Sequence, residues 1–151
     1  MKIETTRFGP VDVDPRRTIT LPKGMLGFSR HKEFALIVTG QDSPFYWLQS
    51  VTEPALAFVV CDPTLFAPDY QVVLKADDQE LLEVQGPDEV TVLVVCNKMD
   101  DLLTGNLQGP IAVNPQTRVA KQLVLSEKRW STRHPLLKLA SRETEVVCQT
   151  A

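Results

Sequence analysis

The stretch from Pro44 to Tyr70 most constrains what this chain of 151 residues can fold into. It contains six of the ten aromatic residues, so much of the large apolar side-chain area is concentrated there. Two short apolar runs within it, 45–48 and 56–61, are rich in β-branched and aromatic residues and are separated by polar residues and Pro54. This pattern predicts two adjacent antiparallel strands joined by a loop.

A loop bounded by two prolines follows the second predicted strand. Pro63 and Pro68 are five residues apart, and a proline lacks the N–H group that a long helix or a central strand requires. The segment 64–69 is therefore predicted to be a rigid, exposed loop, and it is the first place to expect a binding surface. Its acidic and apolar side chains, with those at its two ends, are Asp62, Leu65, Phe66, Asp69 and Tyr70.

Charged residues are distributed unevenly along the chain. Residues 62–101 contain ten acidic and two basic side chains, a net charge of −8, whereas residues 117–151 contain seven basic and three acidic ones, a net charge of +4. Asp77, Asp78 and Glu80 continue the acidic side chains of the loop. The simplest interpretation is a solvated acidic face. The alternative is that this face steers a basic partner protein, and in either case it disfavours direct nucleic-acid binding, because phosphates would be repelled.

Composition places the chain among ordinary globular domains. Its hydrophobic content of 43% and charged content of 23% are typical, and 151 residues suffice for one core without disulfides. No apolar run approaches the roughly 20 residues of a membrane helix, and the start of the chain lacks the apolar core of a signal peptide. Three cysteines without close spacing favour a reducing compartment, so we expect a cytoplasmic protein without membrane contact.

Turn signals about every ten residues divide the chain into roughly nine short strands with one or two short helices. This spacing predicts a mostly β, single-domain antiparallel barrel-like or sandwich fold. The run 91–96 is continuously apolar, as expected of a strand buried on both faces. Further strands are expected at residues 2–8, 11–14, 17–21, 34–38, 70–74, 111–113 and 118–125.

Three further segments are assigned by their caps and breaks. A helix of about two turns is expected to begin at Asp77 as its cap and to end at Gly86-Pro87. Residues 100–106 are expected to form a polar link. His134-Pro135 is expected to break the pattern, with a loose amphipathic helix over 136–145 and frayed residues after it.

Motifs for chemistry are weak. Asn97-Lys98-Met99-Asp100 resembles the guanine-reading motif of GTPases, but the chain contains no GxxxxGK[ST] phosphate loop. Cys61 and Cys96 lie in apolar strands, where cysteine behaves as a small hydrophobe, and the two histidines are far apart. The chain contains no GxSxG turn, and no serine or cysteine is recognisable as a nucleophile beside a base. We therefore predict no catalytic, metal or cofactor-binding residues, and a protein-binding module rather than an enzyme.

A series of ordered blocks resembles the bacterial flagellar assembly factor FliW family. Each block is short, but together they cover residues 1–137, leaving 138–151 as a C-terminal extension. The blocks are Thr6-Arg7-Phe8-Gly9, residues 21–28 (LPKGMLGF), residues 44–50 (PFYWLQS), residues 56–60 with Asp62-Pro63, Pro68-Asp69-Tyr70, Gly109-Pro110-Ile111 with Asn114, Thr117-Arg118 with Lys121-Gln122, and Arg133-His134-Pro135-Leu136.

The resemblance implies a barrel-like β-protein without catalysis that binds the RNA-binding translational repressor CsrA and also flagellin. In such a system the two partners compete, and secretion of flagellin frees the factor to relieve repression of flagellin mRNA. Here the acidic side chains would steer CsrA, while Leu65, Phe66 and Tyr70 would anchor it, unless those rings are core residues. The alternatives are a flagellin-binding chaperone that does not touch CsrA, and a small-molecule-binding β-barrel.

Overall fold

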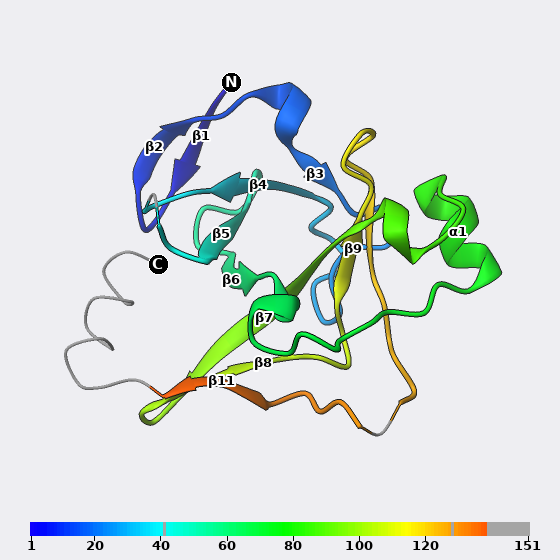
Figure 1. Ribbon diagram of the computed structural model, residues 1–151. Helices are drawn as coiled ribbons and strands as arrows, with labels where there is room; N and C mark the ends of the chain where they lie inside the picture. Colours follow the sequence, from blue (N-terminus) through cyan, green and yellow to red (C-terminus); the bar gives the residue numbers. More distant parts are fainter. Residues whose placement is uncertain (41, 128, 139–151) are drawn as a thin grey trace.

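Nine strands form one curled antiparallel sheet, and a separate two-stranded hairpin lies beside it (Figure 1). The computed structural model describes residues 1–40, 42–127 and 129–138. The strands in these ranges are β1 (Lys2–Thr5), β2 (Gly9–Asp12), β3 (Ile19–Thr20), β4 (Glu33–Ile37), β5 (Phe45–Ser50), β6 (Ala57–Cys61), β7 (Thr91–Met99), β8 (Leu102–Gly105), β9 (Ile111–Val113), β10 (Ala120–Gln122) and β11 (His134–Lys138). The helical elements are η1 (Pro15–Arg17), η2 (Pro63–Leu65), α1 (Ala76–Leu82) and η3 (Pro87–Glu89).

The sheet curls far enough for its two ends to meet. Its order is β10-β9-β7-β6-β5-β4-β3, and β8 carries β11 on the second half of β7. Thr20 at the end of β3 forms a parallel bridge with Val119, and its N–H donates to the carbonyl of Arg118 at 2.9 Å. The predicted barrel-like, mostly β fold is therefore confirmed.

Strand β7 separates two apolar clusters. Val94 and Cys96 belong to one cluster, whereas Leu93 belongs to the other and Val95 packs against it. Because successive side chains of a strand point to opposite faces, β7 is buried on both, as its continuous apolar sequence predicted. Strands β5 and β6 are also the antiparallel neighbours that the aromatic stretch predicted.

Three predicted elements differ in the structure. Residues 70–74 are not a strand: burial alternates along them, with Val72 and Leu74 buried and Val73 exposed, but they pair with no strand among the described residues. The predicted polar link 100–106 contains β8, because Asp100 adopts a left-handed conformation (φ 55°) that closes a hairpin with β7. Near the C-terminus, β11 replaces the first part of the predicted helix 136–145. The rest of that helix lies outside the described residues.

Helix α1 has the predicted length but different ends. Lys75 occupies the position before the helix, and its backbone N–H donates to the carboxylate of Asp78 at 2.9 Å, so Asp77 is not the cap. The helix stops at Glu83, whose φ of 56° is left-handed, before Gly86-Pro87 is reached. No helix in the described part of the chain is long and apolar enough to cross a membrane.

Candidate protein-binding surface

The acidic loop, defined here as residues 62–80, begins with a turn that its first aspartate holds. The carboxylate of Asp62 accepts hydrogen bonds from the backbone N–H of Thr64 at 2.9 Å and from its hydroxyl at 2.7 Å. Pro63 starts η2, and the N–H of Ala67 donates to the carbonyl of Pro63 at 2.8 Å. The loop is thus held by hydrogen bonds and by its prolines, and Asp62 acts first as a cap.

Two apolar side chains of the acidic loop differ in exposure. Leu65 is 60% exposed at the end of η2. Phe66 is half-buried, because its ring stacks on Phe45 of β5 with 5.9 Å between the ring centres. Leu65 is therefore free to contact another protein, whereas Phe66 offers only part of its ring.

Tyr70 is a core residue. Its side chain is 5% exposed, its ring meets Trp130 edge to face at 4.9 Å, and its hydroxyl donates to the carbonyl of Leu107 at 2.5 Å. Burial raises the pKa of the Tyr70 phenol well above its usual value. The expectation that Tyr70 is an exposed anchor is wrong, because its ring belongs to the same buried cluster as Trp130.

Asp69 is exposed but not free. Its carboxylate forms an ion pair with Arg129, whose guanidinium lies 4.6 Å above the ring of Trp130. The ring below the arginine is buried, so the pair sits on a rigid base. The acidic loop therefore contacts the basic C-terminal third of the chain at this point.

Asp78 is the most buried of the predicted acidic contacts. Its side chain receives the ammonium of Lys121 from β10 at 2.5 Å, and the same ammonium lies 3.6 Å from Asp77. Burial alone would raise the pKa of Asp78, but the hydrogen bonds from Lys121 and from the backbone of Lys75 hold it below its usual value. The bond to Asp78 in turn raises the pKa of Lys121.

The charge asymmetry of the sequence is thus smaller on the folded surface. Asp69 pairs with Arg129, and Asp77 and Asp78 share Lys121, so three of the five candidate acidic side chains face a base. Glu80 is exposed on α1 and has no such partner among the described residues. The expectation of a uniformly acidic face is corrected, because residues more than forty positions away supply its counter-charges.

A small groove that sequence reasoning missed runs beside these charges. It has a volume of about 180 Å³ and lies between residues 73–78 and 121–124. Val73 and Val124 line it and are 70% and 66% exposed. Their exposure could not be predicted from the sequence, because the valines belong to the predicted strands 70–74 and 118–125. In the structure neither valine lies in a strand.

The residues that the sequence offered for catalysis, nucleotide binding or metal binding have structural roles in the fold. Asn97 lies on β7 and Asp100 in the turn to β8, so the GTPase-like motif is the end of a hairpin. Cys61 and Cys96 are both buried, with their sulfurs 3.4 Å apart, and their hydrogen bond together with burial raises the pKa of Cys96, which disfavours a reactive thiolate. Within the described residues, no three histidine, cysteine, aspartate or glutamate side chains are grouped to hold a metal ion.

The fold and this surface define a small barrel-like β-protein that presents apolar and charged side chains on turns fixed by hydrogen bonds. A sequence model of one family, described as FliW protein, matches residues 2–136. The chain is 49% identical to a flagellar assembly factor FliW of Geobacter sulfurreducens over 144 residues, which cover 94% of this chain and 90% of that protein. It is 40% identical to the one of Syntrophus aciditrophicus, covering 91% and 89%.

A solved structure agrees with the sequence comparisons. A crystal structure of the flagellar assembly factor FliW superposes with a TM-score of 0.81 at 34% identity, covering 91% of this chain and 97% of the other. The protein therefore belongs to the FliW family of flagellar assembly factors, as its sequence blocks predicted.

Proposed function

We propose that this protein is a cytoplasmic, non-catalytic regulator of flagellum assembly that binds the translational repressor CsrA and flagellin. The observation that carries the proposal is the family match over residues 2–136, which spans every strand of the curled sheet but part of β11. In this scheme unsecreted flagellin occupies the protein. Export of flagellin frees it to bind CsrA, which then releases flagellin mRNA, so that synthesis follows export.

The acidic loop supplies one physical basis for such binding. Leu65 is exposed at a rigid turn and is our candidate anchor, with the open part of Phe66 beside it. Exposed ion pairs contribute only about 0.2–1 kcal/mol each, so Asp77 and Glu80 would influence the rate of encounter more than the strength of binding. CsrA holds RNA phosphates and must be basic near them, so an acidic neighbour would also repel RNA.

A second candidate function is a flagellin-binding chaperone that does not touch CsrA. Its support is the pairing of Asp69, Asp77 and Asp78 with bases, which weakens electrostatic steering, together with the exposed Val73 and Val124 beside the small groove. Such a groove suits capture by apolar contact, and binding of that kind would change little with salt. A small-molecule-binding barrel has less support, because the grooves of about 560 and 180 Å³ in the described part of the chain are both open to solvent and would cover only part of a small ligand.

The test is a pull-down of the purified protein against CsrA and flagellin separately, followed by an RNA-release assay on the CsrA complex. We expect both proteins to be retained and RNA to be released. Leu65→Glu should reduce retention at least tenfold, whereas Met99→Glu, at an exposed position on the β7–β8 hairpin, should leave it unchanged. Retention of flagellin alone would favour the chaperone, and retention of neither would refute the proposal.

A further inference from the structure

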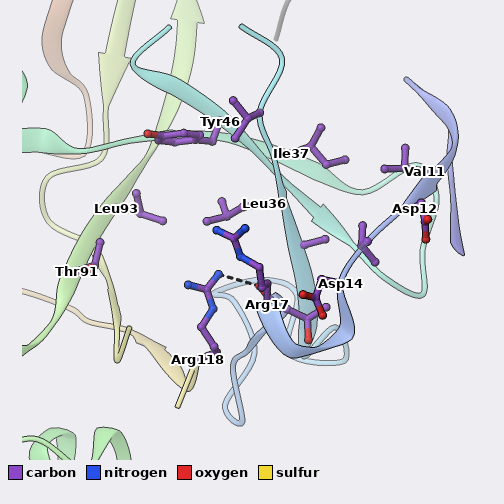
Figure 2. A pocket seen from close by; sticks show the side chains of 14 residues that line it. Val11, Asp12, Asp14, Arg17, Leu36, Ile37, Tyr46, Thr91, Leu93 and Arg118 are labelled. Atoms are coloured by element: carbon purple, nitrogen blue, oxygen red, sulfur yellow. Dashed lines mark hydrogen bonds between the residues drawn. The ribbon is translucent and has the colours of Figure 1, made fainter. Parts of the chain in front are cut away.

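A second and larger groove runs along an edge of β4. It has a volume of about 560 Å³ and is open on one side. Ala35 and Ile37 line it, and so do Leu36 and Val38 (Figure 2). Alternate residues of a strand point to opposite faces, so a hollow lined by both sets must lie at the edge of the strand. The other edge of β4 is occupied by β5, so this is the β3 side, and we call it the edge groove.

The edge groove exists because β3 begins only at Ile19. The ladder between β3 and β4 holds only Ile19 opposite Phe34 and Thr20 opposite Glu33. In the same register, Arg17 would lie opposite Leu36, two residues beyond the pair of Ile19 and Phe34. Instead Arg17 ends the turn η1, and its N–H donates to the carbonyl of Asp14 at 2.9 Å.

The backbone of Leu36 is consequently unpaired on this side. The carbonyl of Glu33 accepts from Val51 on the β5 side, and the carbonyl of Lys32 accepts from Leu21 on the β3 side. Backbone groups alternate between the two edges of a strand, so those of Leu36 point toward β3 and have no partner among the described residues. An edge of this kind is a ready template for another strand.

Two arginines occupy one end of the edge groove. Figure 2 shows the guanidinium groups of Arg17 and Arg118 close together, and Arg118 donates to the carbonyl of Arg17 at 2.8 Å. The Nε group of Arg118 is buried and has no hydrogen-bond partner among the described residues. Neither guanidinium lies within ion-pair distance of an acidic side chain in the described ranges. Two adjacent cations favour an incoming carboxylate.

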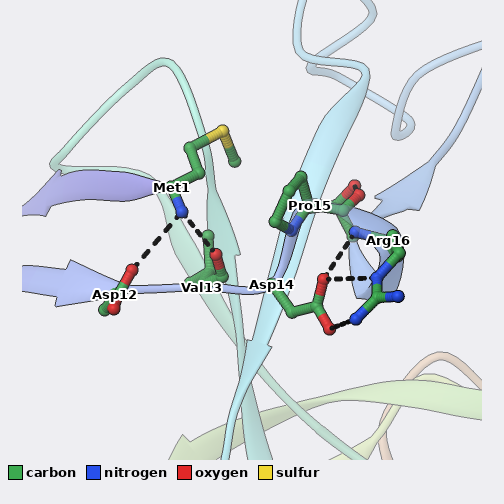
Figure 3. Close-up of polar contacts among 7 residues, drawn as sticks. Met1, Asp12, Val13, Asp14, Pro15 and Arg16 are labelled. Carbon is green, nitrogen blue, oxygen red and sulfur yellow. Dashed lines mark hydrogen bonds and ion pairs between the residues drawn. The ribbon is translucent and has the colours of Figure 1, made fainter.

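The acidic side chains of the edge groove are already engaged (Figure 3). Asp12 pairs with the amino group of Met1 at 3.4 Å. Asp14 accepts from the backbone and side chain of Arg16 at 3.0 and 3.3 Å. The hydrogen bonds from Arg16, and to a smaller extent the charge of Arg17, lower the pKa of Asp14. Within the described residues, neither acid forms an ion pair with Arg17 or Arg118.

We infer that the edge groove binds an extended segment of a partner protein, which adds a strand to β4 and places a carboxylate on Arg17 and Arg118. Leu36 supplies the main-chain hydrogen bonds of this added strand. Side chains of the segment alternate between two surroundings. One set faces Arg17, Arg118 and the ring of Tyr46, and the other faces the apolar side chains of the β1–β2 hairpin such as Val11. The recognised sequence therefore alternates acidic and apolar residues.

A protein segment fits the edge groove better than a free small molecule. The groove is open along one side, so it covers only part of an occupant, and a strand can remain attached to a larger body outside it. The inference rests on the proposed function in that it requires a protein partner. It adds a second contact region, separate from the acidic loop, and it states the chemistry of the segment that binds there.

The first test compares three variants against CsrA and flagellin by titration calorimetry. Arg17→Ala/Arg118→Ala should weaken binding of at least one partner tenfold or more, and Leu36→Pro should do the same by removing the unpaired N–H. Arg30→Ala is the control, because it removes an exposed arginine that does not line the edge groove, and it should change affinity less than twofold. Circular dichroism checks the fold, and if Leu36→Pro does not fold, the double arginine variant decides alone.

The second test uses synthetic ten-residue peptides of alternating valine and glutamate or valine and lysine. The glutamate peptide should bind the wild-type protein and not the double arginine variant, and the lysine peptide should bind neither. Peptide binding without binding of CsrA or flagellin would support the inference while refuting the proposed function. Partner binding that all variants retain would overturn the inference alone. If the protein alone is a dimer and Leu36→Pro abolishes that dimer, the groove serves self-association and the inference is overturned. If free glutamate stabilises the protein as much as the glutamate peptide does, the groove is a small-anion site and the inference is likewise overturned.

Discussion

The acidic loop and the edge groove show opposite relations between sequence charge and surface charge. The loop belongs to a segment with a net charge of −8, yet Asp69 and Asp78 meet Arg129 and Lys121 on the folded surface. The edge groove contains two acids and two arginines, but its acids pair with Met1 and Arg16, whereas neither arginine forms an ion pair within the described residues. Charge counted along a chain therefore identifies a charged surface only where the fold brings no counter-charge from a distant segment.

The largest expected effect separates the buried from the exposed residues of the acidic loop. Tyr70→Ala should lower the free energy of unfolding by about 3–5 kcal/mol, because it leaves a cavity beside Trp130 and an unpaired carbonyl at Leu107. Leu65→Ala should change it by less than about 0.5 kcal/mol. Urea unfolding of both variants measures this difference. Equal stabilities would show that Tyr70 is not part of the core.

The second prediction concerns the ion pair between Asp78 of the acidic loop and Lys121. Asp78→Asn should destabilise the protein by about 1.5–3 kcal/mol, because it weakens the charged hydrogen bond to Lys121 and the bond that closes the start of α1. Asp77→Asn is the matched control, since Asp77 is exposed and lies further from the ammonium. If both variants unfold at the same urea concentration as the wild type, the pair does not stabilise the fold.

The same pair predicts a dependence of stability on pH. The pKa of Asp78 is lower in the folded protein than its usual 3.8, so its contribution is complete above that value and is lost as pH falls through the lower, folded pKa. The pKa of Lys121 is raised above 10.5, so its contribution is complete below 10.5 and is lost as pH rises through the folded pKa. Thermal unfolding across pH should show a smaller acid loss in Asp78→Asn than in the wild type. An identical acid limb would contradict the assignment.

The smallest effect belongs to the exposed pair of Asp69 and Arg129. A double-mutant cycle with alanine at both positions should give a coupling of about 0.2–1 kcal/mol, because both side chains are more than half exposed. The coupling should shrink in 1 M salt, where the screening length is about 3 Å. A coupling that salt does not change would mean that the contact is not electrostatic.

The sequence predicted the parts of the fold that follow from apolar pattern. Strands β5, β6 and β7 are marked by short runs of aromatic and β-branched residues, and the pairing of β5 with β6 follows from their adjacency. The pairing of β6 with β7 was not predicted, because residues 70–74 were expected to form a strand between them. β11 was missed because Pro135 argued for a break. Yet β11 pairs only with β8 among the described strands and shifts register between Pro135 and Leu137, which an edge strand tolerates.

The candidate surfaces were less predictable for a physical reason. Whether Tyr70 is an anchor or a core residue depends on Trp130, sixty residues away, which sequence pattern cannot place beside it. The edge groove depends on where β3 begins, and that is set by the turn η1 rather than by any run of residues around Leu36. Local pattern determines elements, whereas long-range contacts determine which side chains stay open.

Hydrogen–deuterium exchange of the protein alone and with CsrA or flagellin tests the central claim most directly, namely that this FliW-family protein binds its partners with surfaces held open by the fold. We predict that binding of a partner slows exchange at the amide of Leu36, for which the described residues provide no hydrogen-bond partner, and around Leu65 in the acidic loop. Complexes that form without slower exchange at either position would contradict the account.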